Sequence, residues 1–197
     1  MTGRVTRYQG QVATCPYILL NNNMQRKRNR LKEYDYSNAG YYFVTICVND
    51  KKDYFGKIKN EDCVLNEFGV IVKQILENIP VKYPYVELDY YVIMPNHIHI
   101  ILIIDPSENV SVVTSRDLSP VGSPKPKIKS LSDIIGAFKT ISSKELHNKG
   151  LTEFKWQRSF YDRIIRNERE LYQIRKYIEQ NPLSLEIDKQ LPENLTI

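Results

Sequence analysis

The stretch from Tyr90 to Asp105 constrains the fold of this chain more than any other segment. It runs Tyr-Tyr-Val-Ile-Met-Pro-Asn-His-Ile-His-Ile-Ile-Leu-Ile-Ile-Asp, which is mostly aliphatic and β-branched but too short to span a membrane. We therefore predict a buried central strand. Met94-Pro95-Asn96 should turn the chain before its second half, because proline is tolerated at the start of a strand but not inside its ladder.

This strand carries His97 and His99, two of the three histidines in the chain. Residues two apart in a strand point to the same face, so the two imidazoles should stand side by side while Ile98 and Ile100 face the other way. Two neighbouring imidazoles form a partial metal site that needs one more ligand. The alternative is a pair of hydrogen-bonded histidines on a half-exposed sheet.

The composition indicates a soluble intracellular protein with a polyanionic partner. The chain has 197 residues, a net charge of +5, 14 tyrosines and 28 lysines and arginines. Aromatic faces with basic side chains suit single-stranded nucleic acid, through stacking and phosphate neutralisation. The cysteines are odd in number and match no metal spacing, and neither a signal peptide nor a membrane-spanning run is present, so we expect a reduced, cytoplasmic location: Cys15, Cys47, Cys63.

The patterning predicts four or five strands and three helices. Strands are expected at 41–48 and 90–105, a hairpin at 55–58 and 63–65, and a further strand or extended segment at 154–165. Helices are expected from Asn66 to Pro80, from Ser130 or Ser132 to Gly150, and from Asn167 to Asn181-Pro182. This order predicts an α+β sandwich, with helices packed against one face of a mostly antiparallel sheet.

Three further segments complete the predicted organisation around one domain at 31–183. Residues 1–30 form a basic N-terminal arm, which is either a solvated tail or a contact for the DNA backbone. A stretch rich in serine and proline near 106–130 reads as a loop insertion. Residues 184–197 form a C-terminal tail.

The last helix supplies what the histidine strand lacks. Tyr177 and Asn181 are four residues apart and therefore share one helix face. If that face packs against His97 and His99, the imidazoles and the Asn181 oxygen would hold a divalent ion beside the tyrosine hydroxyl. Such a set suits phosphodiester cleavage, because a metal offsets the charge that builds on the phosphoryl oxygens. Alternatively, Tyr177 is a packed aromatic and Asn181 a helix stop.

These motifs together resemble the HUH single-strand transposases, and more closely the REP-associated tyrosine transposases. The resemblance covers roughly residues 30 to 183 in order, except for the loop near 106–130. It rests on His97-Ile98-His99 after Met94-Pro95-Asn96 and on a series of further blocks: Tyr34-Asp35-Tyr36-Ser37, Gly40-Tyr41-Tyr42-Phe43-Val44-Thr45, Phe55-Gly56-Lys57-Ile58, Trp156-Gln157-Arg158-Ser159-Phe160-Tyr161-Asp162 and Tyr177-Ile178-Glu179-Gln180-Asn181-Pro182.

The resemblance implies a ferredoxin-like core, a divalent metal (Mg²⁺ or Mn²⁺), and cleavage and rejoining of single-stranded DNA, often at hairpin-forming repeats. It matches His97 and His99 to the metal ligands, Asn181 to the third ligand and Tyr177 to the nucleophile, with Tyr161 as the rival nucleophile. Relatives occur as monomers and as homodimers that share active sites, so both states stay open.

Two other functions compete with the transposase. One is a non-catalytic module that binds single-stranded nucleic acid, and the other is a metal-dependent nuclease in which water attacks. Basic residues of the N-terminal arm and of the segment 158–166 are the candidate DNA contacts: Arg26, Lys27, Arg28, Arg30, Arg158, Arg163, Arg166.

Overall fold

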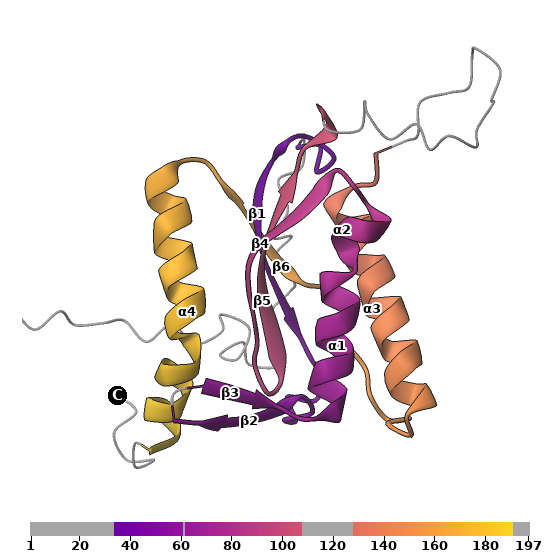
Figure 1. Ribbon diagram of the computed structural model, residues 1–197, viewed down its shortest axis with the longest axis vertical. Helices are drawn as coiled ribbons and strands as arrows, with labels where there is room; N and C mark the ends of the chain where they lie inside the picture. The colour runs from indigo at the N-terminus through magenta and orange to yellow at the C-terminus, as the bar shows by residue number, and fades with distance from the viewer. Residues whose placement is uncertain (1–33, 61, 108–127, 191–197) are drawn as a thin grey trace, which may run out of the picture.

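A computed structural model describes residues 34–60, 62–107 and 128–190 of the chain (Figure 1). The elements in chain order are β1 (Gly40–Cys47), β2 (Gly56–Lys59), β3 (Asp62–Leu65), α1 (Glu67–Glu77), α2 (Ile79–Lys82), β4 (Val86–Ile93), β5 (His97–Ile104), α3 (Leu131–Asn148), β6 (Tyr161–Ile165) and α4 (Glu168–Gln190). The predicted arm at 1–30, most of the loop near 106–130 and the end of the predicted tail lie outside the described residues.

The central sheet has four antiparallel strands in the order β4-β5-β1-β6. With α1 and α3 as crossovers, this is the ferredoxin-like arrangement, and the predicted α+β class is confirmed. The stretch predicted as one strand at 90–105 is the end of β4, the predicted turn at Met94-Pro95-Asn96, which is confirmed, and β5. Proline has no N–H for the ladder, so the chain reverses at Met94-Pro95-Asn96, where Met94 N–H donates to the His97 carbonyl at 2.9 Å.

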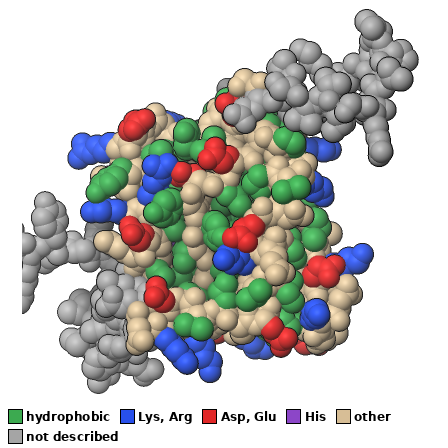
Figure 2. Space-filling view, in the orientation of Figure 1, with side chains coloured by type: hydrophobic (Ala, Val, Ile, Leu, Met, Phe, Trp, Pro, Cys, Tyr) green, Lys and Arg blue, Asp and Glu red, His purple; other side chains and the backbone are tan. Residues whose placement is uncertain are grey.

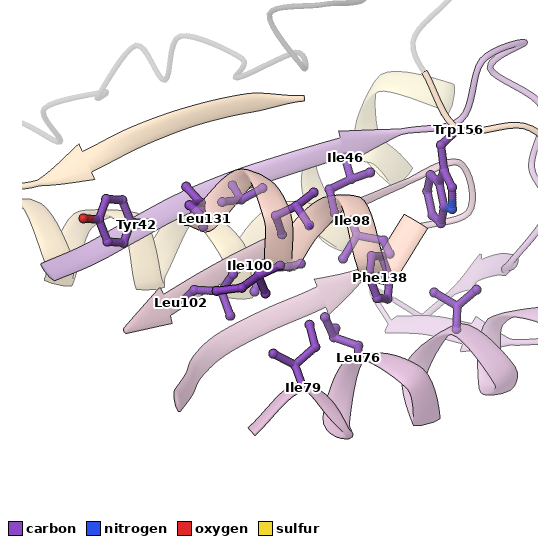
Figure 3. Close-up of a cluster of buried hydrophobic side chains, with 14 of the residues drawn as sticks. Tyr42, Ile46, Leu76, Ile79, Ile98, Ile100, Leu102, Leu131, Phe138 and Trp156 are labelled. Carbon is purple, nitrogen blue, oxygen red and sulfur yellow. The ribbon is translucent and has the colours of Figure 1, made fainter. Parts of the chain in front are cut away.

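Helices cover both faces of the sheet, which corrects the prediction that they share one face. α1 and α3 pack on one face and α4 lies across the other, as Figure 1 shows. On the first face, side chains of β1 and β5 meet those of the helices in the larger apolar cluster, which includes Ile98, Leu76 and Phe138 (Figure 3). An amphipathic pattern identifies the apolar side of a helix but not the sheet face that it covers, so it could not show that α4 lies opposite α1 and α3.

The caps of two helices follow the predicted chemistry. The Asn66 side chain accepts a hydrogen bond from Gly69 N–H at 3.0 Å at the start of α1. Ser130, rather than Ser132, begins α3 in a reciprocal capping box with Asp133. These caps fix the residue at which each of the two crossover helices begins.

The end of α4 differs from the prediction that the helix stops near Asn181-Pro182. The helix continues to Gln190 with Pro182 inside it. Proline removes the one hydrogen bond that its N–H would make to the Ile178 carbonyl, and here the backbone resumes its helical course after that loss. Helix α4 therefore also crosses the predicted domain boundary at 183.

The predicted hairpin of β2 and β3 is confirmed, and it is held close to α1 by a glycine. A Cβ atom added at Gly69 would lie 2.1 Å from the Phe55 carbonyl oxygen of the segment that enters β2. By contrast, a Cβ added at Gly136 in the middle of α3 would meet nothing within 4 Å. Only the first of these two helical glycines is required by a neighbouring backbone.

We predict that Gly69→Ala lowers the free energy of unfolding by about 2 kcal/mol or more, because the hairpin must move away from α1. The matched change Gly136→Ala should raise it by up to about 1 kcal/mol, since alanine has the higher helix propensity and open space is available. Urea unfolding at neutral pH measures both. Equal effects of the two substitutions would contradict this account of the hairpin contact.

Candidate active site

The pleat of β5 places His97 and His99 on the sheet face that α4 covers. Their ring centroids are 4.7 Å apart, and their side chains are almost completely buried, with 5% and 1% exposed. Ile98 and Ile100 belong to the apolar cluster on the opposite face. The predicted alternation along this strand is therefore confirmed, but the half-exposed sheet of the alternative is wrong because α4 covers the imidazoles.

Helix α4 brings Tyr177 and Asn181 to the same place. The Tyr177 hydroxyl lies 3.4 Å from His99 Nε2, and the two rings meet edge to face with centroids 5.2 Å apart. Asn181 is buried, and its side chain hydrogen-bonds His97. Because residues i and i+4 share a helix face, one turn of α4 presents both groups to the two imidazoles. All four side chains come from one chain.

Hydrogen bonds to Nδ1 orient both imidazoles. Asn96 Oδ1 lies 2.7 Å from His97 Nδ1, while the Asn96 amide N–H donates to Asp53 Oδ1 at 2.9 Å. The Asp53 carboxylate can only accept, so the Asn96 oxygen must face His97 and accept from Nδ1–H. On the second ring, Thr45 Oγ1 lies 2.9 Å from His99 Nδ1. This arrangement places a proton on Nδ1 of His97, and in His99 Nε2 faces Tyr177.

Burial keeps the two imidazoles neutral at physiological pH. Desolvation lowers the pKa of His97 to about 4, although the hydrogen bond to Asn181 and the charge of Asp53 act in the opposite direction. Desolvation, with a smaller effect of the neighbouring His97, lowers the pKa of His99 well below its ordinary value. Neutral imidazoles have the free lone pairs that metal ligation requires.

The donor set fits a divalent cation bound by two imidazole nitrogens and one amide oxygen. Both Nδ1 atoms have a side-chain oxygen partner, which is the second layer of contacts that metal-binding histidines commonly have. Within the described part of the chain, no three His, Cys, Asp or Glu side chains gather in a cluster that could hold a metal. The Asn181 side chain, which hydrogen-bonds His97, is an oxygen donor that could serve as a third ligand to a metal at His97 and His99.

Tyr161, the rival nucleophile, lies on the same sheet face but in another environment. It pairs with Thr45 across β1 and β6, and its ring meets Phe43 with centroids 6.4 Å apart. Phe43 also stacks on His99 at 5.6 Å and meets Tyr177 at 6.1 Å. The two tyrosines thus contact the same phenylalanine, and Tyr177 is the one whose hydroxyl meets an imidazole.

The predicted DNA contacts are divided between described and undescribed parts of the chain. Arg26, Lys27, Arg28 and Arg30 lie outside the described residues. Arg158, Arg163 and Arg166 are exposed. The last two line a groove of about 470 Å³ beside the start of α4, where Arg163 Nε also pairs with Glu170 Oε1 at 2.6 Å. On the face that Figure 2 shows, basic and acidic side chains are interspersed.

The roles of several neighbours of the histidines escaped the sequence analysis. Asn96 directly precedes His97 and could have been suspected as its partner. Thr45 reaches His99 only through the register of β1 on β5, which pairs residues 54 positions apart. Phe43 and Asp53 carry no local signal of their position either. His147, the third histidine, is remote and bonds the Phe154 carbonyl through Nε2 at 2.8 Å.

No protein-family model matches the chain. An uncharacterized protein of Haemophilus influenzae (strain ATCC 51907 / DSM 11121 / KW20 / Rd) is 38% identical over 166 residues, which span 83% of this chain and 92% of that protein. A solved structure of a REP-associated tyrosine transposase bound to a REP hairpin superposes with a TM-score of 0.51 at 18% identity, covering 79% of this chain and 73% of that one. The chain thus has a transposase-like fold.

No helix among the described residues has the length and apolar character to cross a membrane.

We predict that the metal-free protein loses stability as the pH falls from about 6.5 to 5. The folded-state pKa of His97 lies below its unfolded value, so the unfolded chain binds more protons in this window and acid favours unfolding. The contribution of His97 to this loss should be about 2 kcal/mol at pH 5, and His99 should act in the same direction. Urea titrations in a chelator measure it, with His97→Gln as the comparison. A wild-type curve no steeper than that of the variant would contradict the burial argument.

Proposed function

We propose that this chain, which belongs to one family with the Haemophilus influenzae protein, is a metal-dependent single-stranded DNA transposase that cleaves and rejoins DNA through Tyr177. The observation that carries the proposal is the Tyr177 hydroxyl 3.4 Å from His99 Nε2, with His97 and Asn181 beside it. Binding alone would not require a hydroxyl at a pair of neutral, oriented imidazoles.

In this proposal Tyr177 Oη attacks the scissile phosphorus, and the bond from phosphorus to the 3′ oxygen breaks. The phenolic proton passes to solvent, the 3′ oxygen takes up a proton, and a 5′-phosphotyrosine link remains. One phosphoester bond replaces another, so the reaction can run backwards and rejoin the strand. The side chain of Phe43 and the packing of α4 hold the phenol in place before substrate binds.

His97, His99 and Asn181 would hold the divalent ion, which supplies charge to offset that of the phosphoryl oxygens. Two imidazoles and an amide oxygen suit Mn²⁺ better than Mg²⁺, which prefers oxygen ligands, although either ion is compatible with the set. The Asp53–Asn96 chain and Thr45 orient the rings from the opposite side of each imidazole.

Single-stranded DNA with a hairpin is the proposed partner. The exposed guanidinium groups of Arg158, Arg163 and Arg166 can contact phosphates, which gives a salt-dependent affinity with little base preference. The solved transposase of similar fold is bound to a REP hairpin. By analogy, a hairpin-forming repeat is the substrate proposed for this chain.

The first test mixes the protein with end-labelled hairpin DNA and Mn²⁺ and separates the products on a denaturing gel. Wild type should form a covalent protein–DNA band, and Tyr177→Phe should abolish it, because only the attacking oxygen is removed. Tyr161→Phe is the matched control and should keep the band. A band that survives Tyr177→Phe but not Tyr161→Phe would move the nucleophile. Cleavage without any adduct would favour the water-using nuclease, and binding without cleavage the non-catalytic module.

A second test measures Mn²⁺ binding by calorimetry in the absence of DNA. His99→Ala should remove measurable binding, whereas Asn96→Leu should weaken it by about 10- to 100-fold, because the His97 ring loses its orienting partner. His147→Asn is the control, since that histidine contacts the Phe154 carbonyl away from the site. Undiminished Mn²⁺ affinity in His99→Ala would rule out the proposed ligand set.

A further inference from the structure

We infer that the ion pair between Arg175 and Asp89 is a positioning device that sets where Tyr177 stands over His99. The inference rests on the proposed function of Tyr177. It assigns a role to two residues that touch neither the imidazoles nor the tyrosine hydroxyl in the contacts described above.

Asp89 occupies an irregular position on the outer strand of the sheet. In the pairing of β4 with β5, Leu88 faces Leu102 and Tyr90 faces Ile101, so Asp89 is the extra residue of a β-bulge. A bulge redirects a side chain that regular pleating would place elsewhere. The Asp89 carboxylate meets α4 at this irregularity, and only 12% of its side chain is exposed.

The contact with α4 is bidentate. Arg175 Nε donates to Asp89 Oδ2 at 2.8 Å, and an Arg175 terminal nitrogen donates to Asp89 Oδ1. A guanidinium fork on a carboxylate accepts only a narrow range of positions and orientations, unlike a single hydrogen bond. Arg175 lies two residues before Tyr177, so the contact constrains the same turn of α4 that carries the phenol.

Apolar packing alone holds α4 loosely in the direction of its own axis. The buried residues of the cluster beneath it, among those described, are Phe43, Ile101, Ile165, Leu171 and Ile178. The two that α4 contributes, Leu171 and Ile178, are seven residues apart on one stripe of the helix, and because apolar packing is non-directional, a directional contact adds resistance to a slip by one turn. Such a slip moves every side chain by about 5.4 Å. It would carry the Tyr177 hydroxyl away from His99.

A second ion pair, Arg163 with Glu170, joins α4 to the opposite edge of the sheet. It involves one nitrogen of an arginine whose side chain is 58% exposed, compared with 39% for Arg175. An exposed single contact is weaker and less directional than a bidentate one. The pair on β4 is therefore the contact that defines the axial position of the helix.

The test compares Asp89→Asn, Arg175→Gln and their combination in single-turnover adduct formation with saturating hairpin DNA and Mn²⁺. Each single variant should form the adduct at least about 10-fold more slowly, because displacement of a reacting atom by about 1 Å has effects of that order or larger. The double variant should be no slower than the worse single variant. The affinities for DNA and for Mn²⁺ should change by less than about 2-fold. Lys73→Gln, which breaks an exposed ion pair within α1, is the matched control and should change none of these quantities.

Asp89→Asn separates positioning from DNA binding. If Arg175 were a phosphate contact, Arg175→Gln would weaken DNA binding and lower its salt dependence, whereas removal of the nearby negative charge in Asp89→Asn would strengthen binding. That pattern, or unchanged adduct rates in both single variants, would overturn the inference.

A readout that needs no activity keeps this inference apart from the proposed function. In the metal-free protein, the ring protons of Tyr177 and His99 should show a nuclear Overhauser effect, since the ring centroids are 5.2 Å apart. We expect Asp89→Asn and Arg175→Gln to weaken it and Lys73→Gln to preserve it. Absence of any adduct in wild type would refute the proposed function, whereas an undiminished effect in both variants would refute the positioning role.

Discussion

The burial of β5 on both faces is the constraint on which the rest of the structure depends. An inner strand of an antiparallel sheet presents alternate side chains to opposite layers, and both layers here exclude water. On the side of α1 and α3, the side chains of β5 are all aliphatic and need no hydrogen-bond partner. On the other layer His97 and His99 must find partners, because a buried polar group without a hydrogen bond is strongly destabilising. Asn96, Thr45 and the face of α4 supply them.

The two layers divide stability from chemistry. The layer under α1 and α3 is the larger apolar cluster and includes Phe138, Leu76 and Trp156, whose Nε1–H donates to Ser142 Oγ at 2.9 Å. The layer under α4 is smaller and contains every residue of the proposed site. A substitution in the first layer should act mainly on folding. A small displacement in the second layer moves a phenol relative to an imidazole, so its effect should appear in the reaction before it appears in stability.

The sequence predicted what depends on local periodicity and missed what depends on distant pairing. His97 with His99 follows from the two-residue repeat of a strand, and Tyr177 with Asn181 from the four-residue repeat of a helix. The pattern predicts the turn at Met94-Pro95-Asn96 but not the two paired strands on either side of it, because both halves of the stretch are apolar. The partnership of Asp89 with Arg175 joins residues 86 positions apart through a bulge, and no local pattern marks it.

The identity of the residue that carries DNA tests the central claim most directly. After incubation with Mn²⁺ and hairpin DNA, nuclease trimming and proteolysis, tandem mass spectrometry locates any nucleotide that remains on a peptide. The account predicts a nucleotide attached through its 5′ phosphate to Tyr177 and to no other residue. A nucleotide on Tyr161, or cleaved DNA with no nucleotide-bearing peptide, would contradict it.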